Sequence, residues 1–357
     1  MAERRQIGFG QRIDDRPGGL GSSAVVVPDG ATGLDDTIAS ALLPERPARG
    51  HKGSFGKLLV IAGSLDYAGA ALLVCRGAGR AGAGLVTLAV PESLQPLFAA
   101  KVVEATTMGL PEDDVEEIDP DPAIARILDH DHDAVVIGPG LRPGLATAEL
   151  VRQLLDVPGD ERVAPIVLDA EALRSLATMD RWWDGARRPA ILTPHAGEFG
   201  RLRAGSGRVP EDDGDLVADD VARVAAARDA AAAWGQVLVL KGARTVIAAP
   251  DGEAAVAPFE NPALASGGTG DVLAGVLGAL LAQGLDPFAA ARLGVYLHGL
   301  AGEHVRERLG DAGLLASDLP DAVATARRRL AVLAERRAGG KRVGFARRHG
   351  DEDRTPA

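Results

Sequence analysis

The stretch NPALASGGTGDVLAG, from Asn261 to Gly275, is the most informative part of the sequence. A glycine-rich loop here leads into an apolar helix of about three turns. The first backbone N–H groups of a helix lack intrahelical acceptors and carry partial positive charge. Glycines let an anion approach these donors without obstruction from side chains. The stretch therefore predicts a cradle for a phosphoryl group.

Asp271 stands in the first turn of this helix, where its carboxylate can reach the same place. A carboxylate beside a phosphate suits a general base that takes a proton from a hydroxyl attacking phosphorus. The alternative is an ordinary helix start, at which the aspartate only compensates the helix dipole. The motif is not a P-loop, because no Gly-Lys-Ser/Thr follows, nor a dinucleotide GxGxxG, because no strand leads directly into it.

Short apolar runs alternate with helical patterns along the chain. The runs predicted as buried strands are Leu58–Ala62, Leu85–Val90, Ala134–Ile137, Ile166–Leu168, Ala190–Leu192 and Val237–Leu240. The predicted helices are Leu34–Leu43, Ala68–Arg80, Pro122–Asp129, Ala146–Leu155, Glu171–Thr178, Gly197–Arg203 and Asp219–Trp234, and the chain is mostly helical from Gly270. This alternation is typical of an α/β fold with a mostly parallel central sheet and helices on both faces. Thr245–Ala249 and Ala254–Pro258 flank a turn at Pro250–Gly252, so the sheet should carry an antiparallel edge.

Four of these strands end in polar or glycine residues: Gly138-Pro139-Gly140, Asp169, His195 and Lys241. Ligands of open α/β sheets bind outside the carboxyl ends of the strands. Each residue alone also has a structural explanation, such as a turn glycine, a helix-capping aspartate or a surface histidine. Four such ends in one sheet nevertheless predict a row of polar groups along one rim.

The chain carries 39 Lys and Arg against 50 Asp and Glu, a net charge of −11. An acidic chain is a poor general binder of nucleic acid, because phosphate backbones are held by Lys and Arg. A single cysteine, Cys75, excludes an internal disulfide framework. The longest apolar run, Val272–Ala282, is too short to cross a bilayer, and no signal-peptide pattern is visible. We expect a cytoplasmic protein that does not contact membranes.

We expect three parts in the chain. Residues 1–30 are rich in Gly, Arg and Asp and should form a disordered extension. Residues 31–334 should form one globular domain, and residues 335–357 a charged, disordered tail.

GGTGDVLAG at 267–275 resembles the C-terminal signature of the ribokinase-like fold, and the chain more closely resembles the ADP-dependent NAD(P)H-hydrate dehydratases. The resemblance runs from Leu42 to about Glu303. Seven further segments match in order: 51–56 (HKGSFG), 67–72 (YAGAAL), 80–86 (RAGAGLV), 137–141 (IGPGL), 168–173 (LDAEAL), 193–199 (TPHAGEF) and 240–245 (LKGART). An ordered set of this kind is much more specific than any one motif.

The resemblance implies repair of a damaged cofactor, the S-form of NAD(P)H hydrate (NAD(P)HX), with ADP as co-substrate and AMP and phosphate as products. Asp271 would deprotonate the ring hydroxyl, which attacks the β-phosphate of ADP. Phosphate would then leave, which is chemically easier than loss of hydroxide. Mg²⁺ would screen the phosphates.

The resemblance also implies site residues. The nucleotide-binding positions would be Lys241, Gly242, Ala243, Arg244, Thr245, Gly268, Thr269 and Gly270. Contacts to the hydrate would come from Ala70, Gly140, His195 and Asp271. Glu198 would hold Mg²⁺ through water, unless it simply lies in the first turn of a helix. The family further implies a homo-oligomer, often a tetramer. We expect the epimerase that is often fused to these enzymes to be a separate protein, since the segment before His51 is too short to hold it.

Two departures from the family pattern bear on substrate geometry. Arg142 follows Leu141 where the family usually has glycine, and Glu171 and Arg174 replace an aspartate and an asparagine. The preferences between NADHX and NADPHX and between ADP and ATP stay open. Two other functions also stay open: a small-molecule kinase of the same fold acting on a hydroxyalkyl group, and a non-catalytic nucleotide sensor.

Overall fold

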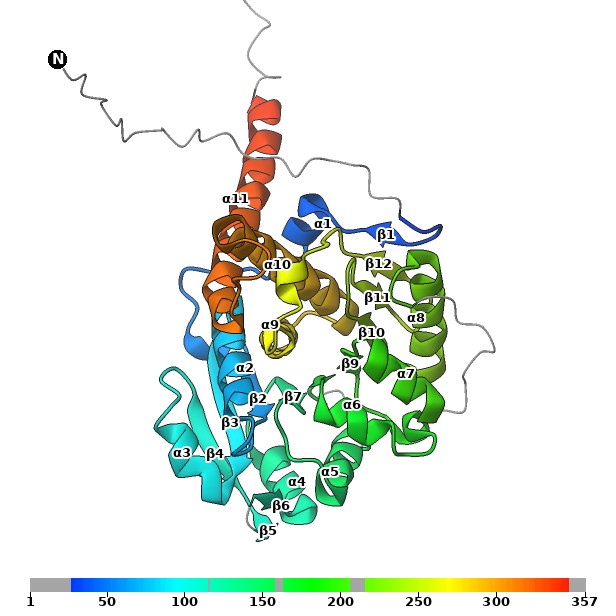
Figure 1. The fold of residues 1–357 in the computed structure, drawn as a ribbon. Helices are drawn as coiled ribbons and strands as arrows, with labels where there is room; N and C mark the ends of the chain where they lie inside the picture. The colour runs from blue at the N-terminus through cyan, green and yellow to red at the C-terminus, as the bar shows by residue number, and fades with distance from the viewer. Residues whose placement is uncertain (1–26, 115, 158–162, 206–215, 347–357) are drawn as a thin grey trace, which may run out of the picture.

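The computed structural model describes residues 27–114, 116–157, 163–205 and 216–346 (Figure 1). A sheet of ten strands in the order β1-β12-β11-β10-β9-β8-β7-β2-β3-β4 forms the centre of the domain. The strands are β1 (Thr32–Gly33), β2 (Lys57–Ile61), β3 (Leu85–Pro91), β4 (Thr106–Leu110), β7 (Ala134–Ile137), β8 (Ile166–Leu168), β9 (Ala190–Leu192), β10 (Val237–Leu240), β11 (Val246–Ala248) and β12 (Ala254–Val256). β5 (Glu112–Asp114) and β6 (Glu117–Ile118) form a separate antiparallel pair.

Helices cover both faces of the sheet (Figure 1). They are α1 (Asp36–Ala41), α2 (Ala68–Ala81), α3 (Gln95–Ala99), α4 (Pro120–Asp129), α5 (Leu145–Leu155), α6 (Glu171–Leu176), α7 (Ala196–Gly205), α8 (Asp220–Trp234), α9 (Thr269–Ala282), α10 (Pro287–Leu309) and α11 (Leu319–Ala346). Successive residues of a strand face opposite ways. Leu58 and Val60 of β2 therefore join a core with α2, α9, α10 and α11, whereas Leu59 and Ile61 join a core with α4 to α8.

The predicted α/β fold is confirmed. β7 to β10 have the predicted bounds, they run parallel, and β10, β11 and β12 pair antiparallel as the hairpin pattern predicted. The prediction missed β1 and β4 of the central sheet, as well as the β5–β6 pair and α3. β4 is an outer strand that is only half buried and contains threonine, methionine and glycine, so it lacks a continuous apolar run. β1 has two residues, too few to make a pattern, and pairs parallel with β12.

The described part of the chain ends with the long helix α11. Residues 1–26 and 347–357 lie outside the described residues. The charged tail was expected from residue 335, and the structure shows that α11 continues past this position to Ala346. Arg337 of this helix donates hydrogen bonds to Thr37 and Ser40 of α1, which joins the early and late parts of the domain.

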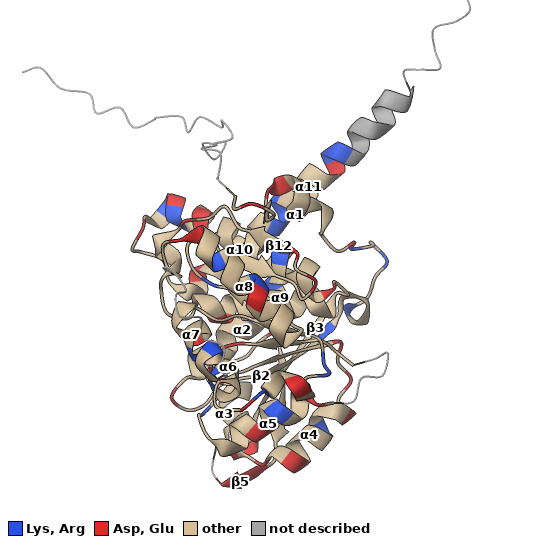
Figure 2. Cartoon of the chain, turned by 90° about the vertical axis from the view of Figure 1, so that its right-hand side faces the viewer, with Lys and Arg blue, Asp and Glu red and all other residues tan. Residues whose placement is uncertain are grey.

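The outer helices carry charges of both signs (Figure 2). On α5, for example, Arg152 pairs with Glu149 at 2.6 Å. Within the described residues, no helix is both long enough and apolar enough to span a membrane.

Helices α2 and α9 pack closely against each other where both carry glycine. A Cβ on Gly275 of α9 would lie 2.1 Å from the carbonyl oxygen of Val74, and a Cβ on Gly77 of α2 would lie 2.6 Å from that of Val272. Because real Cβ atoms cannot approach so closely, any side chain here must push the two backbones apart. The glycines thus set how near α2 comes to the start of α9.

Gly275→Ala should lower the free energy of unfolding by about 1–3 kcal/mol, the usual cost of overpacking. Gly79 of α2 is a matched control, since a Cβ there meets nothing within 4 Å. Gly79→Ala should stabilise by about 0.5–1 kcal/mol because alanine favours the helix. Urea denaturation of both variants checks this, and equal effects at the two positions would contradict the close crossing.

Candidate active site

The start of α9 is held in one conformation by its own loop. Gly268, the N-cap, has φ +89° and ψ −9°, a left-handed conformation that favours glycine. A Cβ there would lie 2.7 Å from Leu73 Cδ1. The Thr269 hydroxyl donates to the carbonyl oxygens of Leu264 (2.8 Å) and Ser266 (3.0 Å). The predicted cradle is therefore a fixed helix start, whose first N–H groups have no acceptor within the helix.

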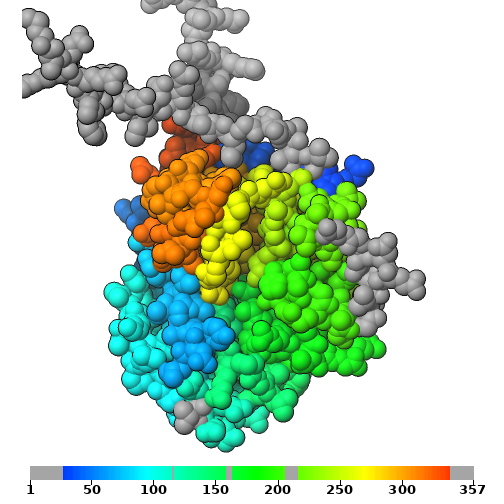
Figure 3. Space-filling view, in the orientation of Figure 1, coloured from blue at the N-terminus to red at the C-terminus, as the bar shows by residue number. Residues whose placement is uncertain are grey.

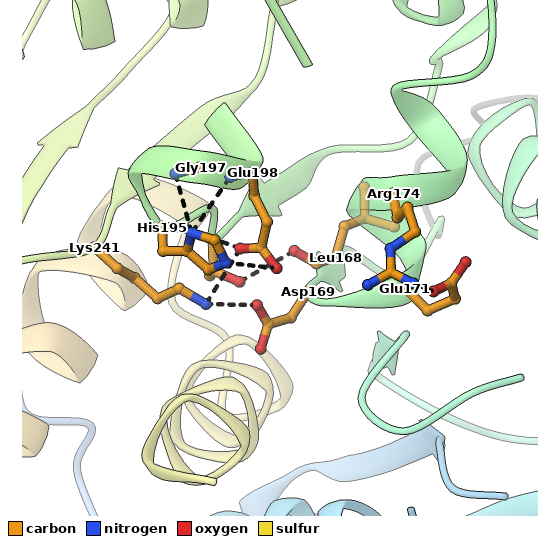
Figure 4. A network of polar contacts seen from close by, with 9 residues as sticks. Leu168, Asp169, Glu171, Arg174, His195, Gly197, Glu198 and Lys241 are labelled. Carbon is orange, nitrogen blue, oxygen red and sulfur yellow. Dashed lines mark hydrogen bonds and ion pairs between the residues drawn. The ribbon is translucent and has the colours of Figure 1, made fainter. Parts of the chain in front are cut away.

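A lysine and two carboxylates meet at the carboxyl ends of β8, β9 and β10 (Figure 4). Lys241 Nζ lies 2.8 Å from Asp169 Oδ1 and 3.8 Å from Glu198 Oε2. Asp169 is 2% exposed, so its charge needs this partner. Gly270 faces the same pair, because a Cβ there would lie 3.5 Å from Lys241 Nζ. The predicted row of polar groups and the glycine-rich helix start thus form one site.

His195 caps α7 and also borders this site. Its Nδ1 accepts hydrogen bonds from the backbone N–H groups of Gly197 (3.1 Å) and Glu198 (3.3 Å). Nδ1 is therefore the unprotonated nitrogen, and Nε2 is left to face Glu198 Oε1 at 3.5 Å. Glu198 in turn accepts from the His195 backbone N–H at 2.9 Å. The structural explanation for His195 is correct, yet its ring also lines the cavity described below.

The charges of the site shift two pKa values. Burial, together with the nearby charge of Asp169, raises the pKa of Asp271 to about 7, and Lys241 opposes both. Burial alone would lower the pKa of Lys241, but Asp169, Glu198 and Asp271 outweigh this and raise it. At neutral pH the lysine is thus a cation, and Asp271 can gain or lose a proton, as a general base must.

A cavity of about 600 Å³ opens beside the start of α9. Figure 3 shows it as a hollow between the α9 segment and the strands β10 to β12, with α10 beneath. Of the predicted residues, His195, Lys241, Gly242, Ala243, Thr245, Thr269 and Gly270 line it. Phe259, Leu264 and Val295 add apolar walls. An apolar slot that ends at cationic and N–H donors is suited to a nucleotide.

Arg244 does not line this cavity. It has φ +52°, and its guanidinium pairs with Asp220 of α8. Its backbone N–H donates to the carbonyl oxygen of Phe259 at 2.8 Å, which ties the loop after β10 to the cavity wall.

Ala70 and Gly140 lie together on the other side of α9. Gly140 has φ +67°, and a Cβ there would lie 2.9 Å from Ala70 Cβ. Leu73, one turn after Ala70 on α2, packs on Gly268. Because α2 and the strands β10 to β12 lie on opposite sides of α9 (Figure 1), the two predicted groups of residues flank its first turn.

Glu171, Arg174 and Arg142, which depart from the family pattern, make defined contacts. Glu171, 9% exposed, pairs with the exposed Arg174 at 3.2 Å, so the two substitutions compensate each other (Figure 4). Burial raises the pKa of Glu171, and Arg174 opposes this. The carbonyl of Arg142 accepts from the Thr147 hydroxyl at 2.7 Å.

Two residues were missed as members of the site. Asp169 follows a strand in the sequence, but only the fold shows that it pairs with Lys241. His298 of α10 lines the cavity and is 8% exposed. Its signal was a histidine within an otherwise apolar helical run, which sequence alone cannot separate from a core residue.

Comparison with known proteins shows the family of the chain. The family model described as NAD(P)H-hydrate dehydratase matches residues 58–324. The chain belongs to this family. The ADP-dependent (S)-NAD(P)H-hydrate dehydratase of Bacillus subtilis is 38% identical over 283 residues, 79% of this chain and 92% of that relative. The bifunctional NAD(P)H-hydrate repair enzyme Nnr of Moorella thermoacetica is 43% identical over 78% of this chain. The chain spans about half the length of that and other bifunctional relatives.

Solved structures of NAD(P)H-hydrate dehydratases share the fold. A Bacillus subtilis ADP/ATP-dependent enzyme, co-crystallized with ATP and Mg²⁺, has a TM-score of 0.69 and 35% identity, covering 86% of this chain and all of that one. A hydroxyethylthiazole kinase from Pyrococcus horikoshii, 14% identical with a TM-score of 0.50 over 81% of this chain and 92% of that one, shares the fold alone.

Proposed function

We propose that the chain dehydrates the S-form of NAD(P)HX with ADP, releasing NAD(P)H, AMP and phosphate. The observation that carries this proposal is the place of Asp271. Its carboxyl group stands in the first turn of α9, where the N–H groups have no acceptor within the helix. Its pKa is raised to about 7 by burial and by Asp169, against the opposing charge of Lys241. A base of this kind beside an anion cradle supports hydroxyl attack on a phosphoryl group.

The proposed reaction has two steps. Asp271 takes the proton of the ring hydroxyl as its oxygen bonds to the β-phosphorus of ADP and AMP leaves. Gly268, Thr269 and Gly270 would hold the transferring group, with Lys241 neutralising its charge. The carbon–oxygen bond then breaks, pushed by the ring nitrogen's lone pair, and phosphate leaves. Loss of a proton from the neighbouring ring carbon to solvent then forms the ring C=C bond of NAD(P)H. Ala70, Gly140 and His195 would contact the hydrate. Gly242, Ala243 and Thr245 would hold the rest of the nucleotide, and Arg244 would shape their loop through its contacts with Asp220 and Phe259.

Mg²⁺ fits the donors present as a phosphate-bound ion. Among the described residues, no three His, Cys, Asp or Glu side chains are grouped to hold a metal. Mg²⁺ commonly binds through one or two carboxylates, waters and substrate phosphates. Glu198, beside Lys241, is the carboxylate we assign to it through water. The ion would screen the charge of the phosphates when bound.

A direct assay tests the proposed function. The protein is incubated with ADP and purified S-form NADHX, and NADH absorbance, AMP and phosphate are followed together. The proposal predicts equal amounts of all three products, with NADPHX and ATP tested in parallel. A stable phosphorylated product without NADH would instead indicate a kinase, and ADP binding without turnover would indicate a nucleotide sensor.

Activity should rise with pH. Asp271 must be ionised to accept a proton, and its pKa is raised to about 7, mainly by burial. The value of kcat/KM should therefore fall about tenfold per pH unit well below 7 and level off above it. Rates at limiting hydrate from pH 5 to 9 check this, with AMP binding as a control for the intact site. A flat profile between pH 5 and 8 would argue against Asp271 as the base.

Two proposals concern partners. The bifunctional relatives bear the name of a repair enzyme, which supports a functional link to an NAD(P)HX epimerase. We also propose that the protein forms a homo-tetramer, and analytical ultracentrifugation of the full chain would measure its oligomeric state.

A further inference from the structure

His298 is a buried titratable group that the proposed reaction does not use. It lies on α10, is 8% exposed and lines the nucleotide cavity. The loop from Phe259 to Leu264 packs closely on α10 because Gly299 and Gly302 follow. A Cβ on Gly299 would lie 2.1 Å from Phe259, and one on Gly302 would lie 2.8 Å from Leu264. These glycines let the loop before α9 approach His298.

His298 makes one defined hydrogen bond. Its Nε2 lies 2.9 Å from the carbonyl oxygen of Thr269, the first residue of α9. A carbonyl oxygen only accepts, so Nε2 carries the proton. Burial lowers the pKa of His298 to about 4, partly offset by the bond to Thr269 and assisted by Lys241. The ring is therefore neutral at physiological pH, with Nε2–H directed at α9.

The hydrogen bond to the Thr269 carbonyl also bears on the N–H of Gly270. The peptide unit that joins Thr269 to Gly270 is planar and trans, so its C=O and N–H point in opposite directions. The helix already directs the Thr269 carbonyl along its axis, and His298 adds a second donor to that oxygen, so the bond helps to hold this peptide and the Gly270 N–H on its opposite side. Gly270 is the second residue of α9, so its N–H has no intrahelical acceptor. Its α-carbon faces Lys241 Nζ, since a Cβ there would lie 3.5 Å from that atom.

We propose that His298 is a positioning residue for phosphoryl binding. Its Nε2–H bond to the Thr269 carbonyl orients the Thr269–Gly270 peptide so that the Gly270 N–H faces the β-phosphate of a nucleoside diphosphate. The Thr269 hydroxyl bonds to Leu264 and Ser266 hold the same residue from the loop side. Thr269 is thus fixed at both its side chain and its carbonyl. This inference rests on the proposed function for the identity of the phosphate.

The test compares ADP with AMP by isothermal titration calorimetry on the full chain. The two ligands differ only by the β-phosphate, so AMP reports on the rest of the cavity. His298→Leu removes the donor and keeps an apolar side chain. We expect ADP affinity to fall about tenfold, which corresponds to the loss of about one hydrogen bond between the Gly270 N–H and the charged phosphate. AMP affinity should change less than about twofold.

Two amide variants make the test specific. His298→Gln places an amide N–H near the position of Nε2 and should regain most of the ADP affinity. His298→Asn carries the same amide nearer the backbone, where it does not reach Thr269, and should resemble His298→Leu. If His298→Leu does not fold, the Gln and Asn variants give the same comparison, with thermal melting to confirm that both are folded.

Three outcomes would overturn the proposal. They are an equal loss of ADP and AMP affinity in His298→Leu, unchanged affinity for both ligands, and equal behaviour of the Gln and Asn variants. Failure of the proposed function is distinct: the unmodified protein would bind ADP more tightly than AMP yet not convert NADHX. The calorimetric comparison holds in that case.

Discussion

Asp271→Asn should lower turnover of NADHX by about 10²–10⁴-fold, the range for loss of a general base. Asparagine has nearly the same shape but cannot accept the hydroxyl proton. ADP binding should be retained or tightened, because the substitution removes a negative charge next to the phosphates. Single-turnover rates and ADP titrations check this, and near-normal turnover in the folded variant would reject the proposed base.

The stability of the same variant is an independent control. Asp271 keeps its proton up to about pH 7 in the folded protein, where burial raises its pKa, but loses it near pH 4 when unfolded. The folded state binds more protons in this window, so this group lowers stability as pH rises from about 4 to 7. The asparagine side chain does not titrate. The variant should therefore match the unmodified protein at pH 4 and exceed it at pH 8 by up to about 4 kcal/mol.

Lys241→Met should weaken ADP binding about 10–100-fold, since it removes a charge-assisted contact to phosphate. It should also lower the free energy of unfolding by about 2–4 kcal/mol, because Asp169, 2% exposed, loses its ion-pair partner. Calorimetry with ADP and urea denaturation measure the two effects. Unchanged ADP affinity would contradict the placement of Lys241 at the phosphates.

The double variant Lys241→Met with Asp169→Asn separates the two effects. Removing both charges leaves no unpaired buried carboxylate at position 169, so most of the lost stability should return. ADP affinity should stay low, because the cation is still missing. If affinity returned with stability, Lys241 would act only through the fold.

The sequence predicted the parts of the fold that have a regular pattern. Strands β7 to β10 are continuous apolar runs that end in glycine or polar residues, and the ends of those runs could be recognised directly. β4 was not predicted, because an outer strand is only half buried and need not be apolar. The continuation of α11 to Ala346 was not predicted, because charged residues after position 334 suit a solvated helix as well as a disordered tail.

Site residues that are adjacent in sequence could be predicted, whereas those brought together by the fold could not. Asp271 and the glycines before it are adjacent in sequence, so their shared chemistry was visible. The Asp169–Lys241 pair joins residues 72 positions apart and depends on the order of the strands. Arg244 was expected at the nucleotide by resemblance, yet its side chain pairs with Asp220, a contact that no local pattern encodes. His298 became visible only when α10 was placed beside α9.

The central claim is that the substrate hydroxyl becomes bonded to phosphorus before it leaves. NADHX labelled with ¹⁸O in its ring hydroxyl tests this most directly, with mass spectrometry of the phosphate released from ADP in a single turnover. The account predicts one ¹⁸O atom in each phosphate molecule. Unlabelled phosphate, with the label in water, would show that ADP hydrolysis and dehydration are separate events, and the account would be wrong.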